Sequence, residues 1–255
     1  MSEFQPAKKA LGQNFLHDQQ IIERIVASIS PKQGDTVIEV GPGRGALTDL
    51  LLQSGCGLHV IEYDYALAEY WQSRAGEVKN FFVHQANVLK VNFNDLSNGV
   101  PTKVIGNLPY NISSQILINL LTAKDVLDCV VMLQLEMVDR IVAEPNSKTY
   151  GRLSVMLQQH FYCDKLFKVP SGAFSPAPKI DSAILRLTPK GSNNALENPA
   201  RFAEVVKASF AQRRKTLRNN LKKMISAEQI QAIGIDPGVR AENLNVDDFI
   251  RLSML

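Results

Sequence analysis

Apolar positions between Thr36 and Leu187 recur with two alternating periods, one typical of strands and one typical of helices. The strand-like runs are Thr36–Val40, Leu58–Ile61, Phe81–Val83, Val104–Ile105 and Cys129–Leu133. The helix-like segments between them are Ala46–Gln53, Tyr65–Arg74 and Ser113–Leu121. This alternation predicts an α/β fold with a parallel sheet covered on both faces. Two later runs, Leu166–Val169 and Ile184–Leu187, are expected to add strands at the far edge of the sheet.

A polar cluster of turn-forming residues at Thr188–Asn194 interrupts this pattern. Beyond it the apolar spacing is helical throughout, and the expected helices are Pro199–Gln212, Lys215–Met224, Ala227–Ile233 and Val246–Ser253. The sequence therefore predicts two domains, an α/β domain over residues 1–190 and a small all-helical domain over residues 191–255.

Composition agrees with a folded chain in a reducing compartment. Of the 255 residues, 45% are hydrophobic, which is enough for a proper core. No apolar stretch approaches the ~20 residues that span a bilayer, and the N-terminus lacks the pattern of a secretory signal. The three cysteines, Cys56, Cys129 and Cys163, lie far apart, so we expect reduced thiols in a cytoplasmic protein. The four histidines are equally scattered, and we expect no metal site.

Charge is concentrated in one window of the chain. Between Arg201 and Met224 there are eight basic residues and one acid, a net charge of +7, whereas the whole chain carries only +3. A solvated helix face is the usual explanation of a charge run. A window more positive than the entire protein favours a polyanionic partner, and nucleic acid is the partner we expect.

The tetrad Asn107-Leu108-Pro109-Tyr110 follows a predicted strand and precedes a predicted helix. The amide oxygen of Asn107 and a neighbouring carbonyl can together accept both hydrogens of an exocyclic amino group on a nucleobase. Proline makes the turn rigid, and the tyrosine ring offers a flat face on which a flipped base can stack. An ordinary strand-ending turn is the alternative, because Asn, Pro and Tyr are all common in such turns.

A glycine-rich loop, Gly41–Ala46, lies between the first strand and the first helix. It satisfies the dinucleotide fingerprint, and Glu62, 21 residues after Gly41, is placed to bind ribose hydroxyls. A nicotinamide or flavin cofactor and S-adenosylmethionine both fit this pattern. The acidic Glu39, the tetrad on the same expected edge of the sheet, and the lack of an evident proton-relay pair favour the methyl donor.

The glycine-rich loop, the acidic Glu62 and the tetrad occur in an order that closely resembles the small-subunit rRNA adenine dimethyltransferases, the KsgA/RsmA family. The resemblance covers nearly the whole chain through four further segments: Lys9–Leu16, Tyr150–Val155, Phe174–Ser182 and Phe210–Leu221. It implies a Rossmann-like class I methyltransferase sheet, and it identifies Phe210–Leu221 with the basic helix of the family.

The resemblance also implies a set of residues that line the S-adenosylmethionine site: Asn14, Leu16, Gly41, Gly43, Glu62 and Asn107. Asn87 occupies the position where the family usually has an Asp that holds the amino group of the cofactor's adenine. An amide oxygen can accept that hydrogen bond without the charge, so we expect somewhat weaker cofactor binding. Alternatively, Asn87 only caps the following turn.

On this resemblance, the substrate is a pair of adjacent adenosines in a hairpin loop of small-subunit rRNA, presented by a partly assembled small subunit to a monomeric enzyme. Asn107 with the carbonyl of Leu108 or Pro109 would hold the amine, and Tyr110 would stack on the base. Phe174 would cover the other face of the base or, alternatively, pack in the core. The expected RNA-binding residues are Lys8, Lys9, Arg213, Arg214, Lys215, Arg218, Lys222 and Lys223. Two other readings stay open, a large-subunit adenine methyltransferase of the antibiotic-resistance type and a non-catalytic ribosome assembly factor.

Overall fold

The computed structural model describes residues 13–191 and 196–255. The expectations for Lys8, Lys9 and the first part of the Lys9–Leu16 segment lie outside these residues. The chain divides into two compact units. The first contains the residues up to Val138 together with Asp164–Pro189, and the second contains Asp139–Cys163 together with Lys190–Leu255.

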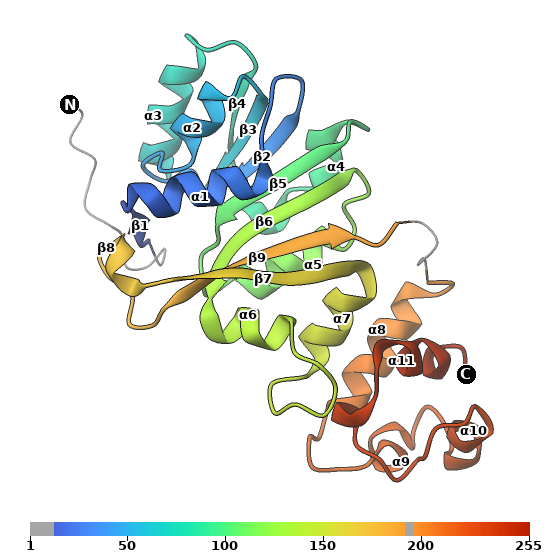
Figure 1. Ribbon diagram of the computed structural model, residues 1–255. Coiled ribbons are helices and arrows are strands. Elements are labelled where there is room, and N and C mark those ends of the chain that lie inside the picture. Colours follow the sequence, from blue (N-terminus) through green and yellow to red (C-terminus); the bar gives the residue numbers. More distant parts are fainter. Residues whose placement is uncertain (1–12, 192–195) are drawn as a thin grey trace. The chain divides into compact units, whose positions relative to one another are not determined.

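A seven-stranded sheet in the order β4-β3-β2-β5-β6-β9-β7 forms the centre of the first unit, as far as the described residues go (Figure 1). Its strands are β2 (Thr36–Val40), β3 (Gly57–Glu62), β4 (Phe81–Gln85), β5 (Thr102–Asn107), β6 (Val126–Gln134), β7 (Phe161–Val169) and β9 (Ser182–Pro189). The strands from β4 to β6 are parallel, and β9 runs antiparallel to β6. The predicted strands and the predicted α/β class are therefore confirmed.

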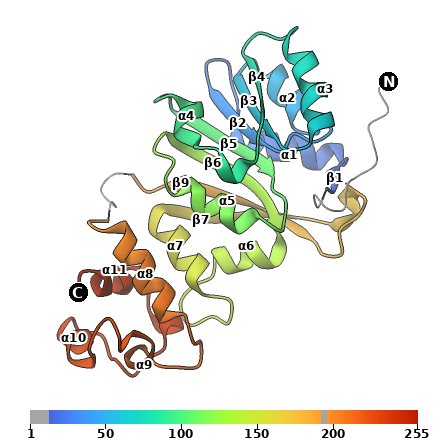
Figure 2. The same ribbon diagram turned by 180° about the vertical axis from the view of Figure 1, so that it is seen from behind.

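Helices cover both faces of this sheet. The helices α1 (Gln19–Ile29), α2 (Thr48–Gln53) and α3 (Tyr65–Ala75) lie on one face (Figure 1). The helices α4 (Phe93–Ser97) and α5 (Ser113–Leu120) lie on the other, seen from behind in Figure 2. Fully buried side chains such as Leu51, Leu58 and Trp71 fill the first of these two layers, as expected for a sheet that is apolar on both sides.

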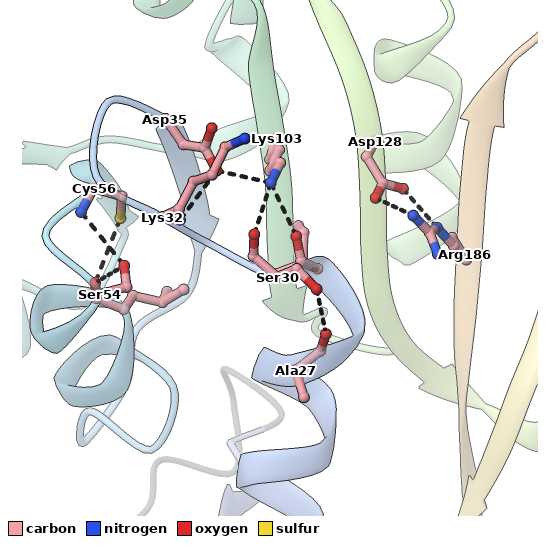
Figure 3. Close-up of polar contacts among 11 residues, drawn as sticks. Ala27, Ser30, Lys32, Asp35, Ser54, Cys56, Lys103, Asp128 and Arg186 are labelled. Carbon is pink, nitrogen blue, oxygen red and sulfur yellow. Dashed lines mark hydrogen bonds and ion pairs between the residues drawn. The ribbon is translucent and has the colours of Figure 1, made fainter.

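Helix α1 is held to the sheet at its C-terminal end. The Lys103 ammonium, from β5, donates to the carbonyls of Ile29 and Ser30 at 3.1 and 2.9 Å and pairs with Asp35 at 2.8 Å (Figure 3). A cation at a helix C-terminus satisfies carbonyls that have no partner within the helix and interacts favourably with the helix dipole.

A separate pair of two-residue strands joins segments that are far apart in the sequence. Strand β1 (Phe15–Leu16) runs antiparallel to β8 (Phe174–Ser175), with Leu16 opposite Phe174. The hydrophobic pattern does not predict these strands, because two residues are too few to show a period. Their pairing connects two of the segments that carry the family resemblance.

The second unit is helical. It contains α7 (Arg152–His160), α8 (Pro199–Ser209), α9 (Leu217–Leu221), α10 (Ala227–Ala232) and α11 (Val246–Ser253), while α6 (Leu135–Ile141) lies across the boundary. Helix α8 packs against α7, α9 and α11 around the fully buried Phe202 and Phe249. None of the described helices is both long and apolar enough to cross a membrane.

The apolar spacing predicted two helices, Pro199–Gln212 and Lys215–Met224, and both are present with shorter bounds, whereas the basic helix that the resemblance placed over Phe210–Leu221 is wrong. Helix α8 ends at Ser209, α9 begins at Leu217, and Arg213, Arg214 and Lys215 lie in the turn between them. The Asn220 amide explains the break, because its Nδ2 donates to the carbonyls of Ser209 at 2.7 Å and Gln212 at 3.2 Å. A side chain that satisfies these carbonyls replaces the backbone N–H groups that a continuous helix would supply.

All three cysteines have reduced thiols, as predicted. Cys56 and Cys129 are buried, and Cys163 is partly buried. Among the described residues no group of three or more His, Cys, Asp or Glu side chains is arranged to hold a metal ion.

Candidate active site

A cavity of about 430 Å³ opens at the carboxyl edge of the sheet in the first unit. Its walls come from the segments that follow β2, β3, β4 and β5, together with Gln13, Asn14 and Phe15 from the N-terminal side. Ligands of open α/β sheets bind at this edge, and the volume lies within the usual range for a cofactor site. The predicted meeting of the glycine loop and the tetrad at one edge is confirmed.

The glycine loop adopts a backbone that other residues would strain. Gly41, Gly43 and Gly45 have φ angles of +72°, +54° and +94°. Trp71 of α3 holds the loop from behind, since its indole N–H donates to the Gly43 carbonyl at 2.9 Å. A side chain at Gly45 would come within 2.7 Å of the same indole ring. Gly41 and Gly43 both line the cavity, so a ligand can approach the main chain of the loop closely.

Glu62 lies at the end of β3 with its carboxylate at the cavity wall. Its two oxygens accept hydrogen bonds from Asp64 N at 2.8 Å and Gly43 N at 3.3 Å. Burial raises the pKa of Glu62, and these backbone N–H groups oppose the rise. Each carboxylate oxygen keeps a lone pair, so Glu62 can still accept hydrogen bonds from ribose hydroxyls.

Asn107 ends β5, and its amide has a defined orientation. The Nδ2 group donates to the main-chain carbonyl of Asn14 at 3.1 Å. One hydrogen of the Nδ2 group is thereby used, and Oδ1 is the atom that can accept hydrogens from a substrate amine. Close packing of β5 against β2 supports this position, because a side chain at Gly106 would lie 2.5 Å from the Val40 carbonyl.

The rest of the tetrad forms a tight turn beside Asn107. The Pro109 carbonyl accepts from Ile112 N at 3.2 Å. No hydrogen bond to the Leu108 carbonyl occurs within the described part of the chain, so of the two carbonyls expected to help Asn107 the one of Leu108 is the more available. The Tyr110 ring lines the cavity, and its hydroxyl lies 2.7 Å from the hydroxyl of Ser182.

Asn87 lines the cavity and also caps a turn. It follows β4 and precedes the short 3₁₀ helix η2 (Val88–Lys90), and its Oδ1 accepts from Leu89 N at 3.0 Å. The capping contact and the cavity position thus occur together, and the oxygen expected to hold an adenine amino group already has one donor.

Two predicted site residues lie away from the main cavity. Leu16 is 8% exposed and contacts a smaller neighbouring cavity of about 50 Å³ behind the glycine loop. Phe174 is 3% exposed, belongs to the hydrophobic core, and is not among the residues that line the main cavity.

Among the cavity residues that were not predicted from the sequence, three have polar or aromatic side chains next to the predicted ones: Gln13, Phe15 and Tyr63. Phe15 lies beneath the loop, with the Arg44 guanidinium 4.2 Å from its ring centre. Gln13 lines the cavity and donates to Asp64 at 3.3 Å, and Tyr63 lines it beside Glu62. Phe15 is within the Lys9–Leu16 segment, whose resemblance to the family was the available signal. Nothing in the sequence around Tyr63 indicated that it would line the cavity. In the structure its side chain is largely exposed.

Glu39 is the most perturbed carboxyl group of the site. It is 1% exposed, borders the smaller cavity, and accepts a hydrogen bond of 2.8 Å from the Thr48 hydroxyl. Burial raises the pKa of Glu39 to about 8, and the nearby carboxylates of Glu62 and Asp49 add to this effect. The group therefore responds to any cation that enters the neighbouring space.

The predicted RNA-binding residues of the second unit are all exposed: Arg213, Arg214, Lys215, Arg218, Lys222 and Lys223. Arg213 differs from the others because it pairs with Glu242 at 3.1 Å and donates to the Lys148 carbonyl. The other five form no ion pair with an acid of the described chain. Their charge is thus available to a polyanion.

Two solved structures resemble this fold over almost its full length. A dimethyladenosine transferase from Plasmodium falciparum superposes with a TM-score of 0.78 at 23% identity, covering 93% of this chain and 95% of the other. The 23S rRNA methyltransferase ErmE gives a TM-score of 0.72 at 26% identity, covering 94% and 98%. The fold is that of the class I S-adenosylmethionine-dependent methyltransferases.

Sequence comparison narrows this class. The model of the ribosomal RNA adenine dimethylase family matches residues 5–255. A ribosomal RNA small subunit methyltransferase A from Francisella tularensis subsp. novicida is 48% identical over 252 residues, which is 97% of this chain and 96% of the relative. A protein of the same name from Xanthomonas campestris pv. campestris is 48% identical over 250 residues, 97% of this chain and 95% of the relative. The chain belongs to the ribosomal RNA adenine dimethylase family.

Proposed function

We propose that this protein transfers methyl groups from S-adenosylmethionine to the exocyclic amino groups of two adjacent adenosines in a hairpin loop of small-subunit rRNA. The observation that carries the proposal is the orientation of the Asn107 amide. Its nitrogen is held by the Asn14 carbonyl at 3.1 Å, and its oxygen is left to accept hydrogens from an amine at the edge of the cavity.

The residues of the cavity fit the cofactor. Gly41 and Gly43 permit close approach of the amino-acid part, and Glu62 can hold the ribose hydroxyls. Asn14, Asn87 and Asn107 complete the proposed binding residues of the cavity, and Leu16 contacts the smaller cavity beside it. When bound, S-adenosylmethionine supplies a methyl group on a positively charged sulfur.

The protein's part in the reaction is to position and polarise the adenine amine. Its nitrogen is a weak nucleophile because the lone pair is conjugated into the ring. Hydrogen bonds from the amine to Asn107 Oδ1 and to the Leu108 carbonyl draw the nitrogen toward tetrahedral geometry and stabilise the positive charge that develops on it. Tyr110 holds the ring by stacking, so that the nitrogen is directed along the line of attack. The methylated nitrogen then loses a proton to water.

RNA binding is assigned to the exposed basic residues of the second unit, including Arg214, Lys215 and Lys222. Phosphate contacts of this kind give affinity without sequence specificity, so the choice of substrate requires the shape of a partly assembled small subunit. We propose that the protein acts on this particle in the cytoplasm, as a monomer and without a metal ion.

A second candidate is methylation of large-subunit rRNA, favoured by the similarity of the fold to the 23S rRNA methyltransferase ErmE. One experiment distinguishes the two candidate functions. Labelled S-adenosylmethionine is supplied with unmethylated small subunits, large subunits and protein-free rRNA, and the modified bases are mapped. We expect two neighbouring dimethyladenosines in small-subunit rRNA. Label confined to large-subunit rRNA would overturn the proposal. No label in any substrate would favour a non-catalytic role in assembly.

A further inference from the structure

Tyr110, which follows β5, is connected at its hydroxyl end to a residue of β9, two strands away in the sheet. The hydroxyl oxygens of Tyr110 and Ser182 are 2.7 Å apart, a good distance for a hydrogen bond between two hydroxyl groups. Tyr110 is half-buried and borders the cavity, whereas Ser182 is fully buried and does not. The contact therefore joins a residue that lines the cavity to a buried residue outside it.

Ser182 is a rigid point of attachment. It is the first residue of β9 and lies opposite Gln134 of β6 in the antiparallel register. The preceding residue, Asp181, accepts from Leu135 N through its carbonyl and from Ser171 N through its carboxylate, both at 3.0 Å. These bonds and the pairing with Gln134 hold the backbone of Ser182 in place, so its hydroxyl extends from a fixed position.

The Tyr110 side chain forms no other hydrogen bond with the described residues. Its backbone lies in the turn after β5, where Ser113 Oγ donates to its carbonyl at 3.1 Å. The ring extends from this turn by two rotatable bonds, and a ring that must present one face to a base loses alignment if either rotates. A hydrogen bond at the hydroxyl restricts the first rotation, which determines where the ring lies. The hydroxyl oxygen lies on the axis of the second rotation, which the bond influences only because a phenolic hydroxyl prefers hydrogen bonds in the plane of the ring.

We propose that Ser182 is a positioning residue, whose hydroxyl holds the Tyr110 ring at the place where the target adenine stacks. The inference rests on the proposed function and deepens it. The Tyr110 hydroxyl then serves as an anchor and takes no proton in the reaction. Burial raises the pKa of Tyr110, so the hydroxyl stays protonated and able to hydrogen bond throughout the physiological range.

A double-mutant cycle tests the contact, because Ser182→Ala and Tyr110→Phe each remove the same hydrogen bond. With unmethylated small subunits and saturating S-adenosylmethionine, each variant is expected to lower kcat about tenfold. KM for the small subunit depends mainly on phosphate contacts and should stay within about twofold. The double variant should be no slower than either single variant, since the interaction can be lost only once.

Ser97→Ala is the matched control for loss of stability. Ser97 is a buried serine of the same unit, 4% exposed, and its hydroxyl donates to Asp125 at 2.6 Å away from the cavity. The Ser97→Ala variant should lower the melting temperature as Ser182→Ala does, and its kcat should equal that of the wild type. If kcat of Ser182→Ala falls no further than that of Ser97→Ala, or if the losses in the cycle multiply, Ser182 does not position Tyr110.

A measurement without catalysis separates this inference from the proposed function. In protein labelled with 3-fluorotyrosine, the ¹⁹F resonance of Tyr110 is assigned by its absence in Tyr110→Phe. We expect Ser182→Ala to shift or broaden that resonance and Ser97→Ala to leave it in place. An unchanged resonance in Ser182→Ala overturns the anchoring role whatever the activity. Failure of the wild type to methylate rRNA would overturn the proposed function. The ¹⁹F measurement would still show whether Ser182 anchors the Tyr110 ring.

Discussion

Asn107 has a donor and an acceptor at the end of its side chain, and the Asn14 carbonyl uses the donor. This explains why an amide and not a carboxylate stands here. An Asp at position 107 would direct an oxygen at the Asn14 carbonyl and lose the bond that orients it. Ala would keep the backbone and remove both functions.

We therefore expect Asn107→Asp and Asn107→Ala each to lower single-turnover methylation by about 100-fold or more, the usual loss when a group that stabilises developing charge is removed. Binding of labelled S-adenosylmethionine, measured by equilibrium dialysis, should change only a few-fold in Asn107→Ala. Asn80→Asp, at an exposed position between α3 and β4, serves as the control for an amide-to-acid change. Near-wild-type turnover of Asn107→Ala would contradict the assigned role.

Asn87 has one oxygen for two tasks, because Oδ1 already accepts from Leu89 N. An Asp there would cap the turn with one oxygen and present the other, with its charge, to the cavity. We predict that Asn87→Asp lowers the dissociation constant of S-adenosylmethionine about fivefold, roughly 1 kcal/mol. Asn92→Asp is the matched control, since Asn92 caps α4 in the same way and does not line the cavity. Equal affinities of wild type and Asn87→Asp in isothermal titration would refute the idea.

Glu39 should make cofactor binding depend on pH. Its pKa of about 8 in the ligand-free protein means that it is mostly protonated at neutral pH. A cationic ligand in the adjoining space favours the carboxylate, so binding releases a proton below this pKa. Affinity should therefore rise with pH toward 8, by up to about tenfold per unit, and level off above it.

Titration calorimetry in two buffers of different ionisation enthalpy measures this proton release. In Glu39→Gln the side chain can still accept the hydrogen bond from Thr48 but has no titratable proton. Cofactor binding to this variant should therefore release fewer protons. The remaining release would come from Glu62, whose pKa is also raised by burial. If Glu39→Gln releases as many protons as the wild type, Glu39 is not the responding group.

At the scale of elements, the sequence predicted those parts whose pattern is long enough to repeat. Strand β2 (Thr36–Val40) and helix α11 (Val246–Ser253) agree residue for residue, and the loop, acid and tetrad lie at strand ends as expected. The parts that the sequence did not predict depend on contacts with residues elsewhere in the chain. Strand β1 exists because Phe15 and Leu16 meet β8, some 160 residues later, and the end of α8 depends on the Asn220 amide.

The connection between α1 and β5 is another such long-range contact, and it gives a stability prediction. Lys103 places its ammonium on two carbonyls at the end of α1 and on Asp35 (Figure 3). Lys103→Met keeps the length of the chain and removes these charged hydrogen bonds. We expect a loss of about 1.5–3 kcal/mol in the free energy of unfolding, measured by urea denaturation. Lys79→Met, at an exposed site, should change it by less than about 0.5 kcal/mol, and equal losses in the two variants would contradict this account.

At the scale of the whole molecule, the proposed function divides two chemical tasks between the two units. The cavity, the tetrad and Glu62 belong to the first unit, and the exposed basic residues belong to the second. RNA affinity and cofactor affinity should therefore respond to different substitutions. Lys222 and Lys223 suit this test because both are exposed and neither forms an ion pair with an acid of the described chain.

Lys222→Glu combined with Lys223→Glu should weaken binding to unmethylated small subunits at least tenfold at physiological salt. The slope of log affinity against log salt concentration should fall by about 2, because two phosphate contacts and their released counterions are lost. The dissociation constant of S-adenosylmethionine should stay the same. A control with Lys79→Glu and Lys124→Glu, two exposed lysines of the first unit, makes the same change in net charge. If the control lowers the salt slope equally, the effect is one of overall charge, and the assignment of RNA binding to the second unit fails.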